Sequence, residues 1–138
     1  MSTLPPVASK SILLIDDDDL IAGSLRQLLL SESCAVDVAV DSLTAREMMS
    51  KQPYDIVMAD PYLTAGVHAD GCGLIENIRT MQPGARLVIL TGYSSPELAR
   101  SAADGKISAL LAKPQSIPFL SQFLVGMPQE TIEPSIKG

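Results

Sequence analysis

Several residue types are scarce in this 138-residue chain, and each scarcity excludes a class of protein. Only two cysteines occur, Cys34 and Cys72, so a disulfide scaffold is not indicated and both thiols are expected to be reduced. Lys and Arg number 10 against 16 Asp and Glu, which gives a formal net charge of -6. Because binding to nucleic acid or to an anionic membrane depends on clustered basic side chains, neither is expected here.

Long apolar segments are also missing. The amino terminus has no apolar stretch behind a basic start, and no window reaches the length of a membrane span, so the cytoplasm is the expected location. There is no internal repeat and no low-complexity segment. Hydrophobic residues nevertheless make up 46% of the chain and charged residues 19%, a balance that fits one compact domain with a core.

Short apolar runs alternate with helical patterns along the chain and predict five successive strand-helix units. The expected strands are 11–16, 35–40, 54–59, 86–91 and 108–112, and the expected helices are 19–32, 42–51, 71–81, 95–104 and 116–126. The first, third and fourth runs are continuously apolar, as in parallel strands covered by helices on both faces. The second run contains Asp37, which suits an edge strand. These patterns predict an α/β fold that is doubly wound around one parallel sheet.

This domain is expected to cover residues 11–126. Residues 1–10 carry Pro5-Pro6 and no periodicity, which predicts a flexible lead-in, and residues 127–138 are expected to form a tail.

Four consecutive aspartates, Asp16 to Asp19, follow the first apolar run directly. Carboxylates crowded at the end of a buried strand repel one another, so a positive group is expected nearby. Mg²⁺ suits this position because it takes oxygen ligands and often binds one or two carboxylates beside a phosphate. A solvated acidic loop that caps the next helix is the alternative that this run alone leaves open.

Other chemically active side chains stand at the ends of the remaining strands. Asp60 follows the third strand, Thr91 ends the fourth, and Lys113 follows the fifth. The carboxyl ends of neighbouring parallel strands meet in one crevice, so these residues are expected to converge with Asp16 and Asp17. A carboxylate can attack phosphorus to form an aspartyl phosphate, while Mg²⁺ and a lysine ammonium neutralise charge. In the alternative interpretation, Lys113 only offsets the acidic cluster and Thr91 only caps a helix.

In combination, these motifs resemble the receiver domain of a bacterial two-component response regulator. The matching residues are Asp16-Asp17, Asp60, Thr91-Gly92, Lys113-Pro114, and Asp70-Gly71 before the third helix. The resemblance covers about residues 10 to 126. It implies a flavodoxin-like, CheY-like fold with five helices and the strand order 2-1-3-4-5.

The resemblance also implies a phosphoacceptor and a metal site. Asp60 would take a phosphoryl group from a phosphohistidine on a sensor histidine kinase or a histidine phosphotransfer protein. Mg²⁺ would be held by Asp17, Asp60 and the backbone carbonyl of Tyr62, with Asp16 acting through water. The remaining aspartates of the run, Asp18 and its neighbour, would then be loop or helix-cap residues.

Two further positions carry implied roles. Thr91 and Lys113 would bind phosphoryl oxygens and serve as switch residues. A cis peptide bond is implied between Lys113 and Pro114.

Two departures from the family pattern concern the switch and one loop. Leu110 stands three residues before Lys113, where receivers usually carry Tyr or Phe, and this puts the usual threonine-to-aromatic switch in question. The interval from Asp60 to Asp70-Gly71 is longer than the family norm by about three residues. The loop 61–69 contains His68, the only histidine, for which a solvent-facing role is expected.

A third departure concerns phosphoryl lifetime. Tyr62 and Tyr93 stand two residues after the acceptor and two after the threonine, where family members vary and tune that lifetime. Bulky rings there would restrict the in-line approach of water to phosphorus, which predicts slow self-dephosphorylation.

The resulting functional prediction is a single-domain receiver that is not an enzyme beyond promoting its own phosphorylation and dephosphorylation. No output domain follows it, so a downstream protein effector is expected, and Met1 with the irregular tail favours a complete protein. The face formed by the fourth helix, fifth strand and fifth helix is the family's usual signalling surface, and a homodimer through it is an open option. The apolar stripe of the fifth helix is expected to be mainly core: Ile117, Phe119, Leu120, Phe123 and Leu124.

Two other classes fit part of the sequence. A pseudo-receiver that docks without phosphorylation normally loses part of the acidic set, which this chain keeps. A phosphatase of the haloacid dehalogenase type would use Asp16-x-Asp18 as nucleophile and general acid, and Thr91 and Lys113 match its later elements. However, Leu20 stands where that family has Thr or Val, and no paired acidic residues follow Lys113.

Overall fold

The apolar runs form the strands of a single parallel sheet in the computed structural model, which describes residues 10–60, 72–92 and 96–127. The sheet has the order β2-β1-β3-β4-β5. The strands are β1 Ser11–Ile15, β2 Ala35–Ala39, β3 Ile56–Ala59, β4 Arg86–Thr91 and β5 Ala109–Ala112. The predicted parallel sheet and the strand order implied by the resemblance are confirmed.

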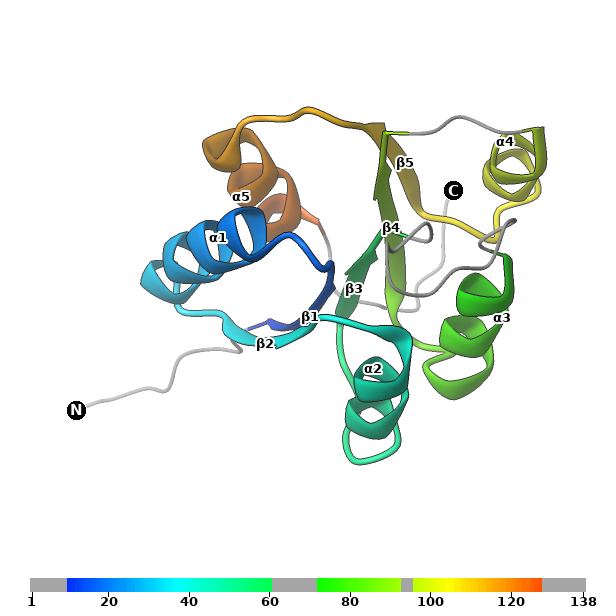
Figure 1. Cartoon of the computed structure of the whole chain (residues 1–138), viewed down its shortest axis with the longest axis horizontal. Coiled ribbons are helices and arrows are strands. Elements are labelled where there is room, and N and C mark those ends of the chain that lie inside the picture. The colour runs from blue at the N-terminus through cyan, green and yellow to red at the C-terminus, as the bar shows by residue number, and fades with distance from the viewer. Residues whose placement is uncertain (1–9, 61–71, 93–95, 128–138) are drawn as a thin grey trace, which may run out of the picture.

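A helix follows each strand, and the first four helices carry the chain back for the next parallel strand. The helices are α1 Asp19–Ser31, α2 Ser42–Met49, α3 Cys72–Met81, α4 Pro96–Ala103 and α5 Ile117–Gly126. Helices α1 and α5 lie on one face of the sheet, and α2, α3 and α4 lie on the other (Figure 1). This is the doubly wound, flavodoxin-like arrangement that was predicted. Within the described residues, none of these helices has the length and apolar character that a membrane crossing requires.

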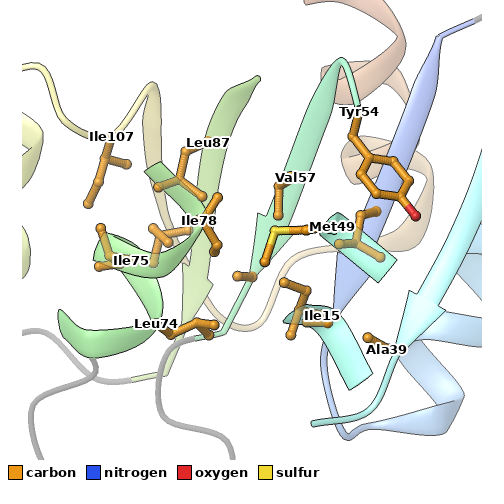
Figure 2. Packing of buried hydrophobic residues seen from close by; sticks show 14 of the residues in the cluster. Ile15, Ala39, Met49, Tyr54, Val57, Leu74, Ile75, Ile78, Leu87 and Ile107 are labelled. Carbon is orange, nitrogen blue, oxygen red and sulfur yellow. The ribbon is translucent and has the colours of Figure 1, made fainter. Parts of the chain in front are cut away.

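The central strands are apolar at every position because helices cover both of their faces. In β1, Leu13 and Ile15 pack with α2, α3 and α4, while Ile12 and Leu14 pack with α1 and α5. All four are fully buried. These residues belong to two apolar clusters, one on each face of the sheet. Figure 2 shows the cluster on the face covered by α2, α3 and α4, where residues from the strands contact side chains of α2 and α3. The two clusters hold the sheet between them and fix the positions of its strand ends.

Strand β3 begins at Ile56, two residues later than predicted, for a local reason. The amide of Tyr54 donates to Oε1 of the buried Gln82 at 2.8 Å instead of joining the sheet. Nε2 of Gln82 donates to the carbonyls of Met49 and Gln52, both at 2.9 Å. One side chain therefore satisfies three backbone groups of the α2-β3 connection. The other predicted element ends differ by at most two residues from the observed ones.

Strand β2 is an edge strand, as its polar residue predicted. Asp37 is half-buried there, and its Oδ2 accepts hydrogen bonds from the Tyr54 hydroxyl at 2.7 Å and from Gln52 Nε2 at 2.9 Å. A polar side chain in this sheet is thus placed where the polar groups of Tyr54 and Gln52 can bind it.

Two residues just outside the predicted bounds of the domain contact it. Lys10, counted with the lead-in, is joined to the sheet, since the Ala35 amide donates to its carbonyl at 2.8 Å. Its ammonium also donates to the Val125 carbonyl in α5. Met127, counted with the tail, packs against the cluster under α1 and α5. The rest of the predicted lead-in and tail, and the loop 61–69, lie outside the described residues.

Candidate functional site

The register of the sheet brings the predicted site residues together at the carboxyl ends of its strands. Ile15 in β1 is paired with Ala59 in β3, so the residues that follow them, Asp16 and Asp60, leave the sheet side by side. The Asp60 amide donates to the Ile15 carbonyl at 3.1 Å, which extends the ladder by one residue. The two carboxylates therefore start from fixed points on neighbouring strands.

Lys113 reaches the same two carboxylates from the direction of β5. Its amide donates to the Thr91 carbonyl at 2.9 Å, directly after β5. Its Nζ lies 2.9 Å from Oδ2 of Asp60 and 3.3 Å from Oδ2 of Asp16. One ammonium thus bridges two carboxylates, and the convergence predicted from the strand ends is confirmed for these three residues.

The carboxylates of this cluster are removed from water. Asp16 is 2% exposed and Asp60 is 8% exposed. Burial raises the pKa of Asp16 above its usual value, although the hydrogen bond from the Asp18 amide and the charge of Lys113 both oppose this shift. For Lys113, burial acts to lower the pKa, but the hydrogen bond to Asp60 and the charges of Asp16 and Asp60 outweigh it and raise the pKa. The ammonium therefore stays charged and compensates the buried carboxylates.

The donor chemistry fits a hard cation such as Mg²⁺. Oxygens of Asp16 and Asp60 already converge on one positive charge, and Mg²⁺ is commonly held by one or two carboxylates together with water and phosphate oxygens. Among the described residues, no group of three His, Cys, Asp or Glu side chains has the arrangement of a metal site. Asp17, the third predicted carboxylate, therefore does not complete such a group with Asp16 and Asp60. Tyr62, the predicted carbonyl ligand, lies outside the described residues.

The remaining predicted residues have different outcomes. Thr91 ends β4 and is only 3% exposed. The peptide bond between Lys113 and Pro114 is cis, as the resemblance implied. Tyr93 and His68 lie outside the described residues.

The acidic run divides into residues with different roles. Asp18 caps α1, because its Oδ1 accepts hydrogen bonds from the amides of Leu20 at 3.1 Å and Ile21 at 3.2 Å. The amide of Asp18 also donates to Oδ1 of Asp16 at 2.9 Å. The cap role was among those predicted for this residue. Its contact with Asp16 was not predicted, because side-chain patterns carry no information on where one backbone amide points.

Strand β5 leaves an apolar surface at the edge of the sheet. Leu110 is 38% exposed, while its neighbours Ala109 and Leu111 pack toward α1 and α5. In α5, Phe119 is 43% exposed and stacks on Phe123, with 6.0 Å between ring centroids. The other members of the predicted stripe, Ile117, Leu120, Phe123 and Leu124, belong to the core cluster or pack against it. The stripe is therefore mainly core, as expected, and Phe119 extends beyond it.

Comparison with known proteins identifies the family to which this chain is similar. The sequence matches the family model described as response regulator receiver domain over residues 12–124. The chemotaxis protein CheY of Halobacterium salinarum is 28% identical, over 84% of this chain and 98% of its own length. The acid tolerance regulatory protein ActR of Rhizobium meliloti is 30% identical, over 91% of this chain but 63% of its own length. The chain thus spans nearly all of one relative and less than two thirds of the other.

Solved structures give the same result. A response regulator from Burkholderia pseudomallei with a phosphorylated aspartic acid, calcium ion and citrate is 29% identical, with a TM-score of 0.70 over 81% of this chain and 64% of that one. A CheY-like receiver domain protein from Methanospirillum hungatei is 25% identical, with a TM-score of 0.74 over 85% of this chain and 91% of that one.

Proposed function

Because this chain belongs to the response regulator receiver domain family of two-component signalling, we propose that it accepts a phosphoryl group on Asp60. The donor would be a phosphohistidine of a sensor histidine kinase or a histidine phosphotransfer protein. The observation that carries the proposal is the 2.9 Å contact between Lys113 Nζ and Asp60 Oδ2 at the edge of the sheet. It places a nucleophilic carboxylate beside a permanent positive charge.

The reaction asks little of the protein beyond position and charge. A carboxylate oxygen of Asp60 attacks phosphorus, the bond between phosphorus and the imidazole nitrogen breaks, and the imidazole leaves with the bonding electrons. The Lys113 ammonium compensates the charge of the phosphoryl oxygens, and the Thr91 hydroxyl donates a hydrogen bond to one of them. Since Asp60 is nearly buried, the donor must approach over the carboxyl edge of the sheet.

Receiver domains bind Mg²⁺, and the residues of this chain suit it. We infer that Asp17, Asp60 and the backbone carbonyl of Tyr62 hold the ion, with Asp16 acting through water. The ion would supply neutralisation of phosphoryl charge when bound. Support comes from the buried carboxylates that share one cation, and from the Burkholderia pseudomallei relative, whose structure contains a calcium ion and a phosphorylated aspartic acid.

Output would occur through contact with a downstream protein, and the apolar surface around Leu110 and Phe119 supports the face formed by α4, β5 and α5 for this purpose. The same face would serve a homodimer if one forms. The match to nearly the full length of the Halobacterium salinarum relative supports a receiver that works as a single domain. The net charge of -6 supports a function that involves neither nucleic acid nor an anionic membrane, and a cytoplasmic location is proposed with it. A docking module that works without phosphorylation is the second candidate, favoured by Leu110 in place of the usual aromatic residue.

A small-molecule phosphodonor separates these two candidates. The protein is incubated with Mg²⁺ and acetyl phosphate, and intact mass is measured for the wild type, Asp60→Asn and the control Asp104→Asn, which changes an exposed aspartate. We expect one added phosphoryl group on the wild type and the control, and none on Asp60→Asn. Absence of an adduct with every donor tried would favour the docking module.

A further inference from the structure

Asp18 connects the first helix to the buried carboxylate of the site. Its own carboxylate accepts the amides of Leu20 and Ile21, and this cap sets its backbone at φ -89° and ψ 98°. In that conformation its amide donates to Oδ1 of Asp16. One residue thus holds the start of α1 with its side chain and holds Asp16 with its main chain.

The two oxygens of Asp16 have separate partners. Oδ1 accepts from the Asp18 amide at 2.9 Å, and Oδ2 lies 3.3 Å from Lys113 Nζ. These contacts at opposite ends of the carboxylate fix its rotation. If the Asp18 amide moves, Oδ1 loses its donor and the carboxylate can turn away from the position shared with Asp60.

We propose that Asp18 is a positioning residue of the phosphorylation site. The helix cap fixes the position of the Asp18 amide, and the amide orients the Asp16 carboxylate. The oriented carboxylate then binds the Lys113 ammonium and, through water, Mg²⁺. This inference rests on the proposed function. Asp18 acts through Asp16 and needs no contact of its own with the phosphoryl group or with Mg²⁺.

Two simpler explanations predict different mutational results. If Asp18 only stabilises α1, any lost cap of equal strength would have the same effect. If Asp18 only adds negative charge near Mg²⁺, Asp18→Asn would weaken Mg²⁺ binding as much as Asp18→Ala. Asn and Ser cap helices about as well as Asp does, so Asp18→Asn and Asp18→Ser remove the charge and keep the cap, whereas Asp18→Ala removes both.

Asp41 supplies a matched control. It follows the edge strand β2 and, like Asp18, caps a helix, since its Oδ1 accepts the Thr44 amide at 2.7 Å. Within the described part of the chain, its hydrogen bonds do not reach Asp16, Asp60 or Lys113. Asp41→Ala therefore removes a cap of the same chemistry without touching the site.

The experiment measures Mg²⁺ affinity by calorimetry and by amide chemical shifts of ¹⁵N-labelled protein, beside the rate of phosphorylation by acetyl phosphate. Asp18→Ala and Asp41→Ala are each expected to lower Tm by about 3 to 6 °C. Only Asp18→Ala is expected to weaken Mg²⁺ binding, by about tenfold, as is usual when an outer-shell partner of a metal site is lost. Asp18→Asn and Asp18→Ser should retain wild-type affinity.

The outcomes separate this inference from the function on which it rests. Equal Mg²⁺ affinity in Asp18→Ala and Asp41→Ala would overturn the positioning role while wild-type phosphorylation still supported the function. Loss of affinity in Asp18→Asn equal to that in Asp18→Ala would assign the effect to charge and overturn it as well. A wild type that neither binds Mg²⁺ nor takes a phosphoryl group would overturn both. If Asp18→Ala does not fold, the Asn and Ser variants still decide between cap and charge.

Discussion

The ammonium of Lys113 lies 2.9 Å from Oδ2 of Asp60, although the strands that precede these residues, β5 and β3, are not neighbours in the sheet. Strand β4 lies between them, and Lys113 reaches past the end of β4 to make the contact. The same nitrogen lies 3.3 Å from Asp16 after β1. One cation therefore joins the ends of three strands at the site.

Removal of this cation should destabilise the fold. In Lys113→Ala, two nearly buried carboxylates would face each other without compensation, and the free energy of unfolding at neutral pH is expected to fall by about 1 to 3 kcal/mol. The figure lies below that of fully buried pairs because the Lys113 side chain is 22% exposed. Urea unfolding of Lys113→Ala and of the control Lys106→Ala, which changes an exposed lysine, measures the difference.

Mg²⁺ should reverse part of that loss, because a second cation can then compensate the same carboxylates. We expect added MgCl₂ to raise the stability of Lys113→Ala more than that of the wild type. An equal rise in both proteins would mean that Mg²⁺ and Lys113 do not act on the same charges.

The buried Gln82 side chain, which lies away from the phosphorylation site, should stabilise the fold. Gln82→Ala would leave the Tyr54 amide and the carbonyls of Met49 and Gln52 without their partner. Unsatisfied buried groups are costly, so a loss of about 2 to 4 kcal/mol in unfolding free energy is expected. Denaturant unfolding of Gln82→Ala beside exposed Gln122→Ala tests this, and a difference below about 0.5 kcal/mol would show that water replaces the lost bonds.

Stability at alkaline pH should depend on Tyr54. Burial and the hydrogen bond to Asp37 raise its pKa to about 12 from the ordinary value of 10.0. Between these values the unfolded chain releases a proton that the folded protein keeps, so stability falls as the pH rises. From about pH 9 to about pH 11 the wild type should lose about 1 to 2 kcal/mol more than Tyr54→Phe. Parallel losses in the two proteins would refute the assignment.

Tyr62 and Tyr93 are proposed to slow the loss of the phosphoryl group. Replacing both with small polar residues should open the path of water to phosphorus and shorten the half-life of the phosphorylated protein by about tenfold, a change of about 1.4 kcal/mol in the barrier. Decay of phosphorylated protein after removal of the donor measures this half-life. An unchanged half-life would exclude control by the two rings, and Tyr54→Phe serves as the control for loss of a tyrosine elsewhere.

Much of the fold and of the site could be predicted from sequence because both depend on periodic patterns. The unbroken apolar run Ile12 to Ile15 predicts a strand covered on both faces, and its end must deliver Asp16 to the edge where Asp60 also emerges. What could not be predicted depends on single tertiary contacts. Gln82 delays the start of β3 by binding the Tyr54 amide 28 residues away, which no local pattern shows.

Contacts of the backbone were equally invisible in the sequence. The resemblance separated Asp16 from Asp18, but only the structure shows that the Asp18 amide binds the buried Asp16 carboxylate while the Asp18 side chain caps α1. Lys113 could have served the acidic cluster or a phosphoryl group. The structure shows the first role for its ammonium, and the second is the proposal.

The central claim is that Asp60 accepts the phosphoryl group, and mass spectrometry that locates the modification tests it most directly. Wild-type protein is treated with Mg²⁺ and acetyl phosphate, digested under conditions that preserve acyl phosphates, and sequenced by fragmentation. The account predicts a phosphoryl group on the peptide that contains Asp60, at that residue, and none in Asp60→Asn. A phosphoryl group on Asp16 or Asp17, or an adduct that persists in Asp60→Asn, would contradict it.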